Sequence, residues 1–67
     1  MAYNLKQLER IVAAVERRPD KRALTDLAQL RTSLRKFLDQ NPGDTQGPDL
    51  RRLLGSADAL LEQFQPA

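Results

Sequence analysis

The chain has 67 residues, of which 40% are hydrophobic and 30% are charged, and its formal net charge is +2. This length suits one compact domain, residues 1–67, and is too short for two. With no cysteine and no histidine, the chain has no disulfides and lacks the side chains that most often hold structural zinc. The longest apolar run, Ile11 to Val15, is far shorter than a membrane span. The first residues contain no apolar stretch of signal-peptide length, so we expect a cytoplasmic protein.

The first helix is expected over residues 5–17. Asn4 is a good N-cap, and Gln7, three residues later, matches the second half of a capping box. Leu8 and Val12 belong to an apolar stripe with spacings of three and four, which is typical of an amphipathic helix. The helix should end before Pro19, because a proline disfavours helical geometry in the residue that precedes it.

A second helix is expected over residues 19–39, with Pro19 in its first turn and Asp20 against the positive end of its dipole. Residues 40–47 are polar or turn-forming and contain Asn-Pro-Gly, which predicts a flexible surface loop. A third helix is expected over residues 48–64. Gly55 and Ser56 lie inside it and predict at most a kink, because the apolar spacing continues across them.

Three amphipathic helices with short and medium connections predict an all-α fold. The arrangement is either a small three-helix up-down bundle or a long helical hairpin with the third helix packed across it. In a domain this small, the stability margin is thin, and self-association or partner binding is a common way to increase it.

No catalytic residues, cofactor or metal ligands are expected. The chain has no histidine or cysteine, no glycine-rich phosphate loop and no serine beside a suitable base. Asp39, Asn41 and Asp44 are oxygen ligands at a loose spacing, but the loop lacks the alternating pattern and terminal glutamate of an EF-hand. The sequence therefore favours a non-enzymatic protein.

The basic residues form two groups and make the charge uneven, with a net charge of +4 in residues 1–40 and −2 in residues 41–67. A basic patch of this kind can bind nucleic acid, although acidic residues are interleaved and aromatic stacking platforms are lacking. It can also be an ordinary solvated surface, and the second helix can be interpreted as a basic amphipathic segment for an anionic membrane. The candidate patch consists of Arg17, Arg18, Lys21, Arg22, Arg35, Lys36, Arg51 and Arg52.

Arg31 is the least expected residue of the second helix, since it lies between Leu24 and Leu38 inside the apolar arc. Two interpretations remain open. The guanidinium either extends past the arc or pairs across the bundle with Glu9 or Asp58, or it anchors a partner on an exposed apolar flank. In the second case the contact surface consists of Leu24, Arg31, Leu38, Leu54 and Leu61.

The sequence thus predicts a protein-protein interaction module, such as a small regulator, adaptor or chaperone-like protein. Its partner is expected to be a helical segment of another protein or a second copy of the chain, bound in an apolar groove rimmed by arginine and lysine. The alternative is a small basic regulator that binds nucleic acid.

Overall fold

The first helix, α1 (Leu5–Arg17), begins at the cap expected from the sequence. In the computed structural model, which describes residues 3–64, the Asn4 side chain accepts a hydrogen bond of 3.2 Å from the backbone N–H of Gln7. This satisfies one of the free donors of the first turn. Among the described residues, only this half of the expected capping box is formed. The helix ends at Arg17, and Arg18 has non-helical backbone angles before Pro19.

The second helix, α2 (Lys21–Gln40), begins two residues later than expected. The start at Pro19 is wrong because Asp20 is the N-cap, with extended backbone angles and a side chain that accepts a 2.8 Å hydrogen bond from the N–H of Ala23. The first N–H groups of a helix have no acceptor within the helix. The Asp20 side chain supplies such an acceptor, whereas a proline in the first turn does not. The chain therefore reverses direction within residues 18–20.

The third helix, α3 (Gly47–Phe64), is continuous across Gly55 and Ser56. The connection before it, residues 41–46, is held by turns, with the N–H of Gly47 bound to the carbonyl of Asp44 at 2.9 Å. Gln46 attaches this connection to Tyr3, which precedes α1. Its side chain accepts a 2.9 Å hydrogen bond from the N–H of Tyr3 and donates one of 2.7 Å to the carbonyl of Tyr3.

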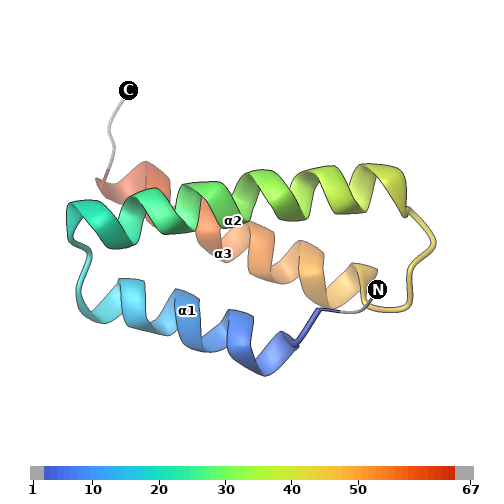
Figure 1. Cartoon of the computed structure of the whole chain (residues 1–67), viewed down its shortest axis with the longest axis horizontal. Coiled ribbons are helices and arrows are strands. Elements are labelled where there is room, and N and C mark those ends of the chain that lie inside the picture. The colour runs from blue at the N-terminus through green and yellow to red at the C-terminus, as the bar shows by residue number, and fades with distance from the viewer. Residues whose placement is uncertain (1–2, 65–67) are drawn as a thin grey trace.

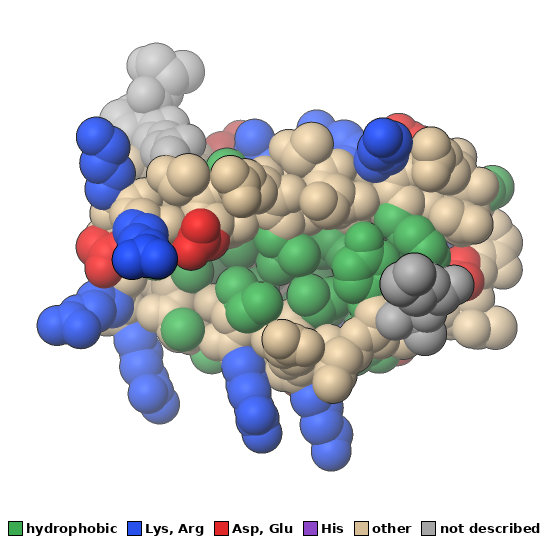
Figure 2. Space-filling view, viewed as in Figure 1, with side chains coloured by type: hydrophobic (Ala, Val, Ile, Leu, Met, Phe, Trp, Pro, Cys, Tyr) green, Lys and Arg blue, Asp and Glu red, His purple; other side chains and the backbone are tan. Residues whose placement is uncertain are grey.

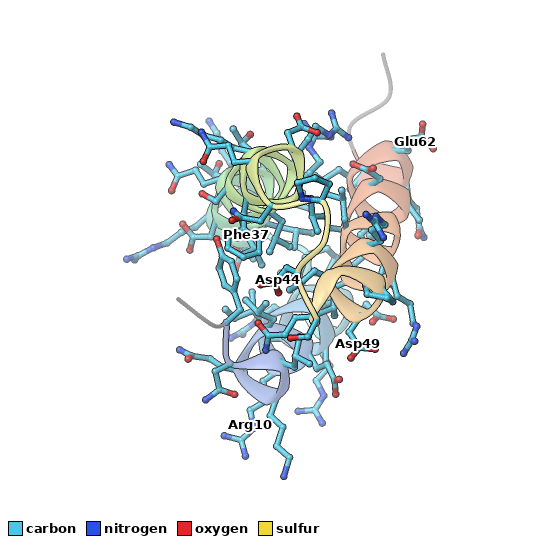
Figure 3. All side chains as sticks on the ribbon, turned by 90° about the vertical axis from the view of Figure 1, so that its right-hand side faces the viewer. Arg10, Phe37, Asp44, Asp49 and Glu62 are labelled. Carbon is cyan, nitrogen blue, oxygen red and sulfur yellow. The ribbon has the colours of Figure 1, made fainter. Side chains whose placement is uncertain are left out.

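The three helices run alternately up and down and form an all-α bundle, with no strand among residues 3–64. Figure 1 shows α1 and α2 side by side, with α3 behind them, and Figure 3 shows the same two layers from the end of the bundle. The bundle measures 33 × 25 × 15 Å, and α3 shares its largest interface with α2. Within the described part of the chain, no helix is long and apolar enough to cross a membrane.

The core follows the space between the three helices in two adjoining clusters. Leu27 and Ala57 are fully buried in one cluster, and Leu34 and Leu50 are fully buried in the other. Leu30 packs against both clusters. Because each helix contacts the other two, each one contributes a wide apolar arc to this core.

Candidate partner-binding surface

Three of the five residues expected to form a contact surface are part of the core. Leu24, Leu38 and Leu61 are only 8%, 7% and 3% exposed. Leu54 is half-buried against the second cluster. The expectation that these flanks are exposed is therefore wrong for the three buried leucines, because a helix that contacts two neighbours buries both flanks of its stripe.

Arg31, the fifth residue, bridges α2 and α3. Its Nη1 lies 3.5 Å from Oδ1 of Asp58, while Nη2 of Arg35 lies 3.3 Å from Oδ2 of the same carboxylate. The Arg31 side chain is about one third exposed, which lets the guanidinium reach solvent at the edge of the core. This geometry matches the ion-pair interpretation, with Asp58 as the partner instead of Glu9.

The two expected basic groups have different surroundings. Arg17, Arg18, Lys21 and Arg22 are all exposed at the end of the bundle where α1 turns into α2, and no ion pair found within residues 3–64 includes them.

The second basic group is largely engaged locally. Arg35 is bound to Asp58, Arg52 lies 3.2 Å from Asp49, and Arg51 donates a 3.4 Å hydrogen bond to the carbonyl of Pro42. These contacts hold the group to the protein itself and leave a weaker basic patch than the sequence suggests.

An open depression of about 480 Å³ lies on the outer side of α2. All of its lining residues come from this one helix, so the depression is the space between neighbouring long side chains and not a cleft between two helices. Two of its cations already share the Asp58 carboxylate. The lining residues are Arg31, Thr32, Arg35, Lys36, Asp39 and Gln40.

Four of the carboxylates have structural partners and do not share a common site. Asp20 caps α2, Asp44 accepts a 2.9 Å hydrogen bond from the N–H of Gln46, and Asp49 and Asp58 pair with arginines. In the part of the chain that the structure describes, no three acidic side chains are grouped so that they could hold a metal ion.

Hydrophobic side chains gather between α1 and α2 on the face of the bundle that lies opposite α3. Figure 2 shows them as a continuous area between more protruding polar side chains, and Figure 3 places Phe37 between the two helices on this face. The residues are half-buried and pack on the core from outside, and we call them the apolar strip: Tyr3, Ile11, Ala23, Leu30 and Phe37.

Helical spacing explains why the strip is linear. Ala23, Leu30 and Phe37 are seven residues apart, so they lie within about 40° of one another on α2. The ring of Phe37 meets that of Tyr3 edge-on, with centroids 5.1 Å apart and an interplanar angle of 88°, a favourable aromatic geometry. The two rings form one end of the strip, and Ala23 marks the other end.

A row of basic side chains, the basic edge, lies on the outer side of α1, about 100 to 140° around the helix from Ile11, and consists of Lys6, Arg10 and Arg17. Their spacings of four and seven residues place them within roughly 40° of one another, and all three are exposed. Figure 2 shows the row projecting from the bundle, and Arg10 points away from it in Figure 3.

Sequence reasoning included Arg17 in the first basic group but missed Lys6 and Arg10. It also missed the apolar strip, whose residues look like ordinary core positions in the sequence. The signal that identifies the basic edge is the separation of charge on α1, since Glu9 and Glu16 lie about 60 to 120° away from it. Glu16 lines a small depression together with residues of α3, which places the acidic flank toward α3.

Comparison of the chain with protein-family models, with curated proteins and with solved structures gives no match.

Proposed function

We propose that the chain is a non-enzymatic interaction module that binds a helix of another protein along the apolar strip. The observation that carries the proposal is the half-buried line of aliphatic and aromatic side chains between α1 and α2. Grooves of this kind typically receive the apolar face of an amphipathic helix. From Ala23 to Phe37 the strip extends about 21 Å, which is the length of roughly four helical turns.

This function fits a small regulator, adaptor or chaperone-like protein, whose stability margin increases when a partner covers apolar surface. We place it in the cytoplasm, since a chain without cysteine suits a reducing compartment. A second copy of the chain is the competing occupant of the strip. Binding of a second copy through the same face is less favourable, because that face is a recess and not a ridge, and two recesses do not fill one another.

The test is a titration of the 15N-labelled chain with an 18-residue amphipathic helical peptide that has leucines on one face and glutamines on both flanks. We expect chemical-shift changes concentrated at Ile11, Leu30 and Phe37. Changes spread evenly over all three helices, or the absence of binding, would contradict the proposal.

Two phenylalanines provide a matched pair of variants. Phe37→Ala should weaken binding of the peptide at least about tenfold, because a buried aromatic anchor is typical of an interface hot spot. Phe64→Ala, which truncates a side chain that is 38% exposed near the end of α3, should leave binding unchanged. Circular dichroism of both variants shows whether the helices persist, and Ile11→Gln gives a second strip variant if Phe37→Ala unfolds.

A second candidate function, nucleic-acid binding by a small basic regulator, is favoured by the four exposed basic residues where α1 turns into α2. Such a contact releases counterions, so the affinity for a DNA or RNA duplex must fall steeply with salt. Fluorescence anisotropy between 50 and 200 mM salt, roughly the range over which such affinities change most, tests this. A flat response excludes the second candidate.

A further inference from the structure

The two sides of the apolar strip differ in charge. On the α1 side stands the basic edge, which extends about 16 Å from Lys6 to Arg17. None of its three residues takes part in an ion pair within residues 3–64. Glu16 lies toward α3, and Glu9, three residues after Lys6, can offset only part of the positive charge of the edge.

The α2 side of the strip carries less positive charge, with exposed Lys36 about 100° from Phe37 on the helix. Gln29 and Ser33 are exposed there and carry no charge. Arg22 and Asp26, one turn apart near the start of the helix, have opposite charges that offset each other. Figure 2 accordingly shows mainly uncharged polar atoms above the strip and a row of basic side chains below it.

An occupant of the strip therefore meets positive charge mainly along one of its two flanks. Carboxylates on that flank gain attraction from several cations at once, whereas carboxylates on the other flank gain nothing comparable. Lysine and arginine side chains are long enough to lean over the edge of a bound helix. If the occupant has basic residues on the flank next to the basic edge, the two rows of positive charge repel each other.

We propose that the partner segment is an amphipathic helix with acidic residues along one flank, and that this flank lies over Lys6, Arg10 and Arg17. The inference rests on the proposed function and adds the chemistry of the partner. It also fixes the direction of the bound helix. Turning a helix end for end exchanges its two flanks, so the acidic flank determines which way the helix runs along the strip.

Three peptides that differ only in one flank test the charge preference. Each has 18 residues and the same leucine face, and the variable flank carries four glutamates, four glutamines or four lysines. At low salt we expect the glutamate peptide to bind at least about tenfold more tightly than the lysine peptide, with the glutamine peptide between them. The difference should shrink as the salt concentration rises.

Charge reversal in the protein supplies the matched control. In Lys6→Glu/Arg10→Glu the order should reverse, with the lysine peptide now bound more tightly. Lys21→Glu/Arg51→Glu has the same change in net charge but alters exposed residues away from the strip, since Lys21 lies about 160° from Ala23 on α2, so it should keep the original order. If both double variants shift the preference equally, net charge alone is responsible and the inference fails.

The direction is tested with two glutamate peptides of identical composition that carry the acidic residues on opposite flanks of the leucine face. Viewed with the leucine face down and the N-terminus toward the reader, one peptide has them on the left and the other on the right. A spin label at the peptide N-terminus should broaden the amide signals near Phe37 for one peptide and near Ala23 for the other. The same direction for both peptides contradicts the inference.

The remaining outcomes separate the inference from the function on which it rests. Equal binding of all three peptides at the strip keeps the proposed function and overturns the acidic partner. If none binds at the strip, both proposals fail. If sedimentation then shows a dimer that Ile11→Gln dissociates, the strip belongs to a second copy of the chain.

Discussion

The side-chain amide of Gln46 is bound to the backbone of Tyr3 through two hydrogen bonds, one in each direction. The amide thereby pairs with Tyr3 as a neighbouring peptide group would. Through this pair, the connection between α2 and α3 holds the residue whose ring packs against Phe37. The end of the apolar strip that the Tyr3 and Phe37 rings form, its closed end, thus depends on Gln46, a residue from outside the three helices.

Gln46→Ala should destabilise the fold by about 1–2 kcal/mol, since two half-buried hydrogen bonds contribute roughly that much. Urea unfolding followed by circular dichroism measures the change. Gln29→Ala removes an exposed amide from α2 and should stay within about 0.5 kcal/mol of the parent chain. Equal effects of the two substitutions would show that the amide pair adds nothing to stability.

Leu61→Ala should cost about 2–5 kcal/mol, because the side chain is 3% exposed and its removal leaves a cavity in the core. The sequence alone placed this residue on a partner-binding surface. Phe64→Ala, one turn later and partly exposed, is the control and should cost far less. A small loss for Leu61→Ala would argue that this flank is open in solution.

The Arg31 and Asp58 pair should contribute less than about 1 kcal/mol, since both side chains are more than one third exposed and the pair is screened by solvent. A double-mutant cycle with Arg31→Gln and Asp58→Asn measures the coupling energy. We expect it to decrease as salt is added. A coupling that is large and independent of salt would instead indicate a desolvated pair.

Gly55→Ala should stabilise the protein by up to about 1 kcal/mol, the difference in helix propensity between the two residues. The glycine lies in α3 with a negative φ, and a Cβ placed there meets no atom within 4 Å. Gly43→Ala has the same space but lies outside the helices, so its effect on the thermal midpoint should be smaller. Destabilisation by Gly55→Ala would mean that α3 bends at this position.

Local patterns in the sequence identify the helices well, because caps and spacing act within a few residues. Asn4 and the 3.6-residue periodicity predict α1, whereas the start of α2 required knowing whether Pro19 or Asp20 lies at the helix boundary. The local sequence allows both. The hydrogen bond from Ala23 to Asp20 decides between them.

The surface was harder to predict, since exposure depends on how three helices pack. Leu24 and Leu30 look alike in the sequence, yet the first is buried and the second is half-buried beside α1. Only the placement of α3 behind both other helices separates them. Arg31 was recognised as unusual from its position in the apolar arc, and Asp58 was one of two acidic partners that the spacing allowed.

The pair between Tyr3 and Gln46 joins residues that are 43 positions apart, whereas the helices themselves consist of local contacts. Bundles rich in local contacts fold quickly, and distant contacts usually form late. The amide pair should therefore form after the folding transition state. Its loss should accelerate unfolding and leave the refolding rate nearly unchanged. The closed end of the strip is then also the part of the molecule that assembles last.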